Sequence, residues 1–420
     1  MLGSVLKSIN RRLGTQSRAA ETRGASAATN DGNPASTPQK PNLALAPDQI
    51  DPKWYEGKPG YIQRFVLEMS GECNLRCVYC PQAGENYVPA KALSEGMFDD
   101  VLAYLKRHPV DMIDLTGTGD MSMAPDWVDK CERLLALGIK LVVTMNYGTI
   151  LTDEQIEILS RFTELTVSLD TIDRKILNTV RKAVDVRTII YNIMRIRAAE
   201  RRNNTNVRWV VSAVYTAEIV ERLPELASFA AAFGANRFQI QDLIEFNEFN
   251  IAKKVTDVWT LTGPQAIAAV VATTSAIEIA QRNGLNTLMP PNFVERLDKL
   301  REVASQSRNW SSMTQTPGAY FSTFNPAPES GQTRDCVDPW TFVHVMSDGR
   351  IRPCCISNLH IGKMQKDQGG MEAAFNSEVA VKLRKQLLTG KLDDLCTACS
   401  LRPVIDIASY QKKVRDMTAG

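Results

Sequence analysis

The chain of 420 residues is 44% hydrophobic and carries 49 basic and 47 acidic side chains, a net charge near +2. This length suits two or three folded domains, and the balanced charge gives no overall field that favours a nucleic acid partner. No apolar run approaches the roughly 18 residues that span a bilayer, so we expect no transmembrane segment and a cytoplasmic location.

Residues 1–53 are predicted to form a basic tail and a low-complexity linker. The first 20 residues contain four basic side chains, no acidic one, and apolar residues at helical spacing. An amphipathic helix there could contact a membrane surface or a partner, but such short terminal segments are more often frayed, so we favour a tail. From about 21 to 50, small and polar residues without periodicity predict a linker.

Between about residues 62 and 245, six short β-branched or aromatic runs alternate with amphipathic stretches. These candidate strands are Phe65–Met69, Met112–Thr116, Lys140–Met145, Leu165–Leu169, Val207–Val214 and Arg237–Gln241. The repeats predict an α/β fold with a parallel sheet, as a partial (β/α)6 TIM-like barrel over residues 54–250 or as a doubly wound sheet. In both folds, functional side chains gather at the C-terminal ends of the strands.

Residues 251–333 are predicted to form a helical insert followed by a loop-rich bridge. The helical part ends near residue 290, with Pro264 near a helix start and Gly284 after its end. From about 291, frequent proline, serine, asparagine and glutamine predict loops. Residues 334–420 form the last predicted domain, in which Asp348-Gly349 indicates a β-hairpin.

Eight of the nine cysteines fall into two groups at opposite ends of the chain, which favours metal ligation over disulfides. Cys73, Cys77 and Cys80 follow the first predicted strand with the spacing C-x3-C-x2-C. Three thiolates leave one iron of a cubane cluster without a protein ligand, open to a small molecule. A zinc site completed by a distant residue is the alternative, but no histidine is near in sequence, so we favour an iron–sulfur cluster.

This spacing, with Tyr79 before the third cysteine, resembles the signature of radical S-adenosylmethionine (SAM) enzymes. The resemblance implies a 4Fe–4S cluster whose open iron binds SAM, and reductive cleavage to a 5′-deoxyadenosyl radical that takes a hydrogen atom from a substrate. It also implies an external electron donor such as flavodoxin or ferredoxin.

Later segments resemble stretches that bind SAM in that family. Thr116–Asp120 is similar to a Gly-Gly-Glu-Pro stretch, with Asp120 in place of the usual glutamate. Asn146 lies in a segment similar to Thr-Asn-Gly, and Ser168 and Arg181 match residues that contact the ribose or the methionine carboxylate. The structural alternatives are turns after the strands and a solvated arginine. The implied SAM contacts are Tyr79, Gly117, Thr118, Gly119, Asp120, Asn146, Ser168 and Arg181.

The second group offers four thiolates that could hold zinc or a cubane: Cys336, Cys354, Cys396 and Cys399. Its segments Cys-x-x-Pro-Trp, Pro-Cys-Cys and Cys-x-x-Cys resemble the twitch module, a shortened SPASM domain, which implies that these four bind one auxiliary 4Fe–4S cluster. Cys355 is left over; we interpret it as a buried apolar residue, with a hydrogen-atom donor or a further ligand as alternatives. Cys131 and His344 are interpreted as structural.

The resembling family includes dehydrogenases of sugars or aminocyclitols, in which the auxiliary cluster accepts an electron, and maturases of ribosomally made peptides. Residues 1–53 show no pattern of the recognition domain that is common in peptide maturases. We therefore predict oxidation of a small polar substrate, with a peptide maturase or a redox-neutral epimerase as the alternatives. A zinc-stabilised binding protein without catalysis is a further alternative.

Overall fold

The computed structural model describes residues 44–244, 255–305, 326–354, 358–364, 370–399 and 401–419. The predicted basic tail at residues 1–20 and the leftover Cys355 lie outside these ranges. Within them, no helix combines the length and the apolar character needed to cross a bilayer.

The six predicted strands are present as parallel neighbours in one sheet, which confirms the α/β fold class. They are β1 (Arg64–Leu67), β3 (Met112–Asp114), β4 (Lys140–Met145), β5 (Glu164–Ser168), β7 (Arg208–Tyr215) and β8 (Arg237–Asp242). A short strand that the sequence analysis missed, β9 (Asn286–Leu288), pairs in parallel with β8 and extends the sheet. The sheet order ends at β9 on this side, so the described strands form an open, partial barrel.

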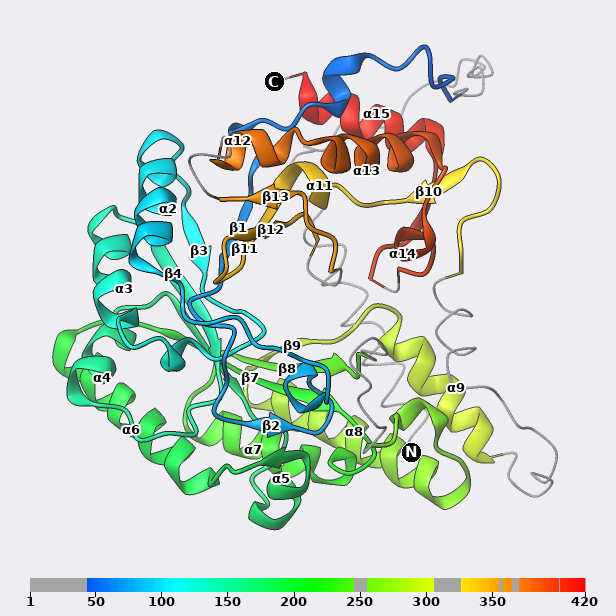
Figure 1. Ribbon diagram of the computed structural model, residues 1–420. Helices are drawn as coiled ribbons and strands as arrows, with labels where there is room; N and C mark the ends of the chain where they lie inside the picture. The colour runs from blue at the N-terminus through cyan, green and yellow to red at the C-terminus, as the bar shows by residue number, and fades with distance from the viewer. Residues whose placement is uncertain are drawn as a thin grey trace, which may run out of the picture. The chain divides into compact units, whose positions relative to one another are not determined.

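The helices between these strands lie along one side of the sheet (Figure 1). They are α2 (Glu95–Arg107), α3 (Trp127–Ala136), α4 (Asp153–Leu159), α5 (Arg174–Val180), α6 (Val186–Asn203), α7 (Leu223–Ala232) and α8 (Gly263–Arg282). The predicted capping box opens α4, where Thr152 accepts from the Gln155 amide and Gln155 bonds back. Gly138 and Gly234 follow α3 and α7 with φ of 78° and 81°, a left-handed conformation that favours glycine.

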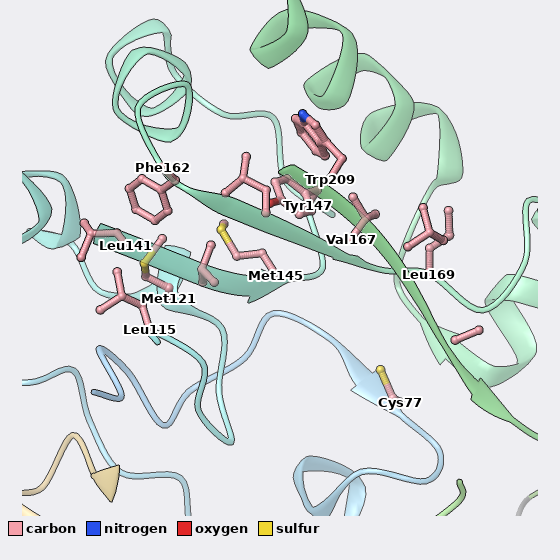
Figure 2. Close-up of a cluster of buried hydrophobic side chains, with 14 of the residues drawn as sticks. Cys77, Leu115, Met121, Leu141, Met145, Tyr147, Phe162, Val167, Leu169 and Trp209 are labelled. Atoms are coloured by element: carbon pink, nitrogen blue, oxygen red, sulfur yellow. The ribbon is translucent and has the colours of Figure 1, made fainter. Parts of the chain in front are cut away.

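The two faces of the sheet differ in polarity. On β4, Leu141, Val143 and Met145 are buried, whereas the intervening Val142 and Thr144 are half-buried. The same alternation runs through β5 and β8, where the half-buried side chains include Thr166, Ser168 and Gln239. The outer face is therefore an apolar layer under the helices; Figure 2 shows part of it, with Trp209 between a strand and a helix.

A parallel sheet that is covered on both faces usually consists of continuous apolar strands. Here the inner face instead carries hydroxyl and amide side chains that keep partial contact with solvent. We define the inner face as the side of Val66, Thr144, Thr166, Ser168, Ser212 and Gln239, which are register partners or alternate neighbours across the sheet. On β4, β5 and β8 this face is polar and partly exposed, whereas β1, β7 and β11 are largely buried on both faces; the polar part is suited to line a binding site.

The C-terminal part continues the same sheet on its other side. Strand β11 (Phe342–Val345) pairs in parallel with β1, and β12 (Arg350–Arg352) and β13 (Gly362–Lys363) follow in antiparallel order. The turn between β11 and β12 holds Gly349 at φ 81°, which confirms the hairpin predicted at Asp348-Gly349. β10 (Gln332–Arg334) and β14 (Val404–Asp406) form a separate antiparallel pair.

Helices α11 (Asp338–Thr341), α12 (Gly370–Phe375), α13 (Glu378–Thr389), α14 (Asp394–Thr397) and α15 (Ile407–Thr418) complete the C-terminal part (Figure 1). A second core forms here around Trp340, Leu387, Tyr410 and Val414. Ile50, which the sequence analysis places in a linker, is buried in it.

A buried arginine ties the segment before β1 to these helices. The Arg384 guanidinium donates to the backbone carbonyls of Tyr55, Pro339 and Phe375, and the Trp340 indole donates to the Trp54 carbonyl. Residues 50–55 therefore pack with the C-terminal helices, although the predicted boundary at residues 53 and 54 assigns them to the tail and the barrel. The fourfold division of the chain stays a prediction.

The helical insert is present as α8, with Pro264 at its start. The bridge predicted from about residue 291 instead begins with a helix, α9 (Phe293–Ser305), so this part of the prediction differs from the structure. Phe293, Leu297 and Leu300 are buried on α9 at spacings of three and four, which is typical of a helix. The prediction of loops gave more weight to the nearby prolines than to this spacing.

Candidate active site with two cysteine groups

The first cysteine group lies in the loop that follows β1. Cys77 is buried, whereas Cys73 and Cys80 are half-buried. Burial raises the pKa of Cys73 to about 11 and that of Cys80 to about 12, and the charge of Cys77 adds to both increases. Three thiols that hinder one another's ionisation need a neighbouring positive charge to become thiolates, and the irons of a bound cluster would supply it.

The cysteine loop is held by a short antiparallel pair, β2 (Arg76–Cys77) and β6 (Arg181–Lys182), in which Cys77 faces Arg181. The Arg181 guanidinium donates to both oxygens of Asp170, at 2.7 and 3.0 Å. The Tyr79 hydroxyl donates to the same carboxylate at 2.6 Å, and the Val214 amide donates to it at 3.0 Å. Asp170 and Arg181 are 1% and 4% exposed, so this pair lies in a low-dielectric interior.

Two of the residues that the resemblance implies as SAM contacts are hydrogen-bonded within the protein. Tyr79 and Arg181 lie beside the cysteine loop, but both are bonded to Asp170, which supplies the carboxylate partner of Arg181 from within the protein. Asp170 was not selected from the sequence, although it directly follows the predicted strand end. Contact of Tyr79 or Arg181 with a cofactor stays a prediction.

We expect Asp170→Asn to lower the free energy of unfolding by about 3 to 5 kcal/mol, because it leaves the Arg181 charge buried without its counter-ion. The matched control is Asp185→Asn. Asp185 also pairs with arginines, but Arg174 and Arg187 are 60% and 71% exposed, and such a pair contributes about 0 to 1 kcal/mol. Chemical denaturation of both variants checks this, and equal losses would contradict a buried ion pair that stabilises the loop.

The glycine-rich loop after β3 packs against the end of β1. A methyl group on Gly117 would lie 2.3 Å from Glu68 Cγ, and one on Gly119 would lie 2.3 Å from the backbone oxygens of Ser70 and Glu72. Both glycines are therefore needed for close approach of two loops. The Thr118 amide donates to Glu68 Oε1 at 2.6 Å.

Asp120 and Asn146 connect this loop to the first cysteine group. Asp120 is buried; its Oδ1 accepts from the Ser122 amide and hydroxyl, and its Oδ2 accepts from the Asn146 amide at 3.0 Å. The Asn146 side-chain amide donates to Asn74 Oδ1 at 2.8 Å and to Cys73 Sγ at 3.7 Å. Donors aimed at a cysteine sulfur stabilise its thiolate form.

Ser168 lies at the end of β5 on the inner face and is half-buried. Among the described residues, the structure thus gathers Tyr79, Asp120, Asn146 and Arg181 around the first cysteine group, with the loop of Gly117, Thr118 and Gly119 packed beside it. Their assignment as SAM contacts stays a prediction.

The second cysteine group assembles from three segments. Cys336 precedes α11, Cys354 follows β12, Cys396 lies in α14, and Cys399 follows that helix, each half-buried. Burial raises the pKa of Cys336 and raises that of Cys396 to about 12, and the charge of Cys354 adds to both increases. The four thiols therefore lie near one another. Four thiolates suit a cluster in which every iron has a cysteine ligand.

Arg334 fixes the backbone around this group. It is 1% exposed and donates to the carbonyls of Cys396, Thr397 and Arg402. In the described ranges, no three histidine, cysteine or carboxylate side chains lie at the spacing of a single metal ion. Cys131 is fully buried in α3, as predicted for a core residue.

Sequence reasoning missed Glu68 and Tyr87, two residues that lie near each other and near Arg352. Glu68, at the end of β1, is 1% exposed; its Oε1 accepts from Thr118, and its Oε2 accepts from the Ser347 amide and hydroxyl. Burial and the charges of Glu68 and Cys80 raise the pKa of Tyr87 to about 12, while Arg352 opposes this increase. Tyr87 thus lies close to the first cysteine group and to Arg352, two residues before Cys354.

His344 lies on the inner face as well, 8% exposed, and its Nε2 has no hydrogen-bond partner among the described residues. Burial lowers the pKa of His344 to about 3, and the positive charges of Arg352 and Arg64 act in the same direction. The imidazole is therefore neutral at physiological pH. The available signal was strand periodicity, since His344 alternates with Val343 and Val345, which face the core.

This buried histidine predicts a pH dependence. The unfolded chain binds a proton at His344 near pH 6.5, but the folded protein does so only near pH 3, so stability is lost as the pH falls below 6.5. Well below pH 6.5, the loss from this group is about 1.4 kcal/mol per pH unit. Denaturation between pH 6.5 and 4.5 should show a steeper loss for wild type than for His344→Gln, and equal slopes would contradict it.

Comparison with known proteins identifies two matched regions. A profile of the radical SAM superfamily matches residues 67–228, and a profile of SPASM, an iron–sulfur cluster-binding domain, matches residues 336–400. Two curated relatives are GTP 3′,8-cyclase 1 of Pseudomonas aeruginosa, 26% identical over 194 residues, and a probable GTP 3′,8-cyclase of Methanopyrus kandleri, 29% identical over 177 residues. The matches cover 45% and 41% of this chain, and 57% and 54% of the relatives, so the chain spans little more than half of each.

Two solved structures have a similar fold. Streptococcus suis SuiB bound to the precursor peptide SuiA has a TM-score of 0.55 and 18% identity, covering 91% of this chain and 79% of that chain. Native anSMEcpe with bound AdoMet has a TM-score of 0.52 and 14% identity, covering 85% of this chain and 96% of that chain. At these identities, the likeness concerns the fold.

Proposed function

Since this chain is a radical SAM protein with a C-terminal SPASM iron–sulfur cluster-binding domain, we propose that it removes a hydrogen atom from a small polar substrate and oxidises it. Its cofactors are SAM, the 4Fe–4S cluster that binds SAM, and at least one auxiliary iron–sulfur cluster in the SPASM domain. When bound, these groups supply a 5′-deoxyadenosyl radical as hydrogen-atom acceptor and a second site for electron transfer.

The proposed ligands are the cysteines of the two groups. Cys73, Cys77 and Cys80 would hold the SAM-binding cluster, and the four half-buried thiols of the second group would hold one auxiliary cluster. Three ligands suit a cluster that keeps one iron open for a small molecule, and four suit a cluster that only transfers electrons. An external donor such as flavodoxin or ferredoxin would provide the reducing electron.

One observation carries the proposed substrate site. Part of the inner face is polar and half-buried, and Tyr87 is close both to Cys80 and to Arg352, which lies two residues before Cys354 of the second cysteine group. A substrate on this face would lie between the two groups. The packed elements around the substrate would keep water from the reacting carbon. They include the buried Glu68, which accepts hydrogen bonds from both Thr118 and Ser347.

A peptide maturase is the second candidate. SuiB, which shares this fold, has been crystallised with a precursor peptide, and that structure aligns with 91% of this chain. A redox-neutral epimerase would need a hydrogen donor, for which Cys355 is the candidate that the sequence offers.

The experiment that separates these functions follows mass changes in deuterium oxide. Reduced protein with SAM is incubated with separated small-molecule and peptide fractions, and the compounds consumed in proportion to 5′-deoxyadenosine are identified. We expect a small molecule that loses two mass units without deuterium uptake. A peptide product would favour the maturase, and a product that gains one deuterium would favour the epimerase; either result would replace our proposal.

A further inference from the structure

Two neighbouring side chains on the inner face carry nitrogen atoms that have no hydrogen-bond partner among the residues that the structure describes. They are Arg352 Nε and His344 Nε2, both buried and without a hydrogen bond in the described part of the chain. Their residues are direct cross-strand partners in the β11–β12 hairpin, so the two side chains leave the sheet on the same side. A buried donor without a partner is costly, and native structures usually satisfy it with water or a ligand.

Strand register determines the side on which they lie. Val343 and Val345 pair with Phe65 and Leu67 and belong to the main hydrophobic core. Side chains alternate along a strand, so His344, the partner of Val66, projects to the opposite, inner face. Arg352 follows it there as its register partner.

The surroundings of this pair are cationic. The positive charges of Arg352 and Arg64 both act on His344, whereas burial lowers the pKa of His360 to about 4, so its imidazole is neutral at physiological pH. His360 Nε2 is a third buried nitrogen without a hydrogen bond among the described residues. The charges of Arg64 and Arg352 therefore act on the same region of the inner face, around His344.

The nearby carboxylates are already occupied. Glu68 accepts three hydrogen bonds from Thr118 and Ser347, and Asp348 forms an ion pair with Arg350 at 2.6 Å. Arg352 donates to the side-chain oxygen of Asn358, and it forms no ion pair within the described residues. Its Nε–H remains available to an acceptor on the inner face.

We propose that Arg352 and His344 bind an anionic group of the substrate, a carboxylate or a phosphate. The guanidinium supplies charge and a donor fork that matches either anion, and the neutral imidazole supplies a donor in the tautomer that carries its proton on Nε2. This inference rests on the proposed function, because it assigns a chemical group to the same substrate. Anchoring a non-reacting anionic group here would orient the substrate between Tyr87 and the second cysteine group.

Isothermal titration of anaerobically reconstituted protein, saturated with SAM, tests this with inorganic phosphate and with acetate at constant ionic strength. We expect wild type to bind one of the two anions, and Arg352→Gln to weaken that binding at least about tenfold, since a charge-assisted hydrogen bond is lost. The matched control is Arg350→Gln, on the same strand, whose charge is already paired with Asp348; its affinity should stay within about twofold of wild type.

Preferential binding of phosphate would identify a phosphorylated substrate, and preferential binding of acetate would identify a carboxylate. No binding to wild type, or equal weakening in both variants, would overturn the inference. Circular dichroism and iron content verify that Arg352→Gln is folded, and His344→Phe provides a second, uncharged test of the same site. Formation of 5′-deoxyadenosine by wild type is measured in parallel, so failure of the anion site is distinguished from failure of the proposed function.

Discussion

Replacing Cys77 with alanine is expected to lower the iron content of anaerobically reconstituted protein from about eight to about four atoms per chain, because each cubane contains four irons. Cys77 is the most buried thiol of the first group and is fixed by its pairing with Arg181. Its loss leaves two ligands for a cluster that already lacks a fourth. We therefore also expect loss of 5′-deoxyadenosine formation.

The control for this experiment is Cys131→Ala. Cys131 is a buried cysteine in α3 that belongs to the hydrophobic core, so its variant should keep about eight irons. Iron and acid-labile sulfide analyses check both variants. Full iron content in Cys77→Ala would contradict the ligand assignment, and about four irons in wild type would mean that the second group is misassigned.

A second large effect is expected for Cys396→Ala, which should remove the auxiliary cluster while the first cluster remains. Cys396 lies near Cys354 and Cys399, and Arg334 fixes its backbone carbonyl. Without this cluster, an oxidation has no place for the second electron, so substrate oxidation should stop although SAM is still cleaved.

The measurement is product formation alongside 5′-deoxyadenosine, with iron content as a check that about four atoms remain. Unchanged product formation in Cys396→Ala would argue against the auxiliary cluster as electron acceptor and would favour a redox-neutral reaction. The control is Lys391→Ala, at an exposed position between α13 and α14, which reports any iron or activity lost during preparation.

The strands were predictable because their local patterns are strong. Lys140–Met145 was bounded correctly, since a β-branched run with apolar residues at alternate positions can bury only one face. The first cysteine group was equally accessible, because its spacing within one loop is local information. The same holds for the Asp348-Gly349 hairpin, where the turn chemistry is contained in two residues.

The pairing of β11 with β1 was not predictable in this way. Val66 and His344 become neighbours across more than half of the chain, and neither local sequence specifies that partner. The roles of Glu68 and Asp170 depend on such distant contacts, with Ser347 and Tyr79 respectively. His344 was interpreted as structural from its apolar neighbours, whereas its position in the register places it on the polar inner face.

The central claim is that the first cysteine group supports reductive cleavage of SAM. The most direct measurement is 5′-deoxyadenosine formed by anaerobic, reconstituted and chemically reduced protein that is given SAM. We expect wild type to form it and Cys73→Ala, Cys77→Ala and Cys80→Ala not to form it. Absence of 5′-deoxyadenosine from iron-loaded wild type, or the recovery of zinc in place of iron at these cysteines, would contradict the claim.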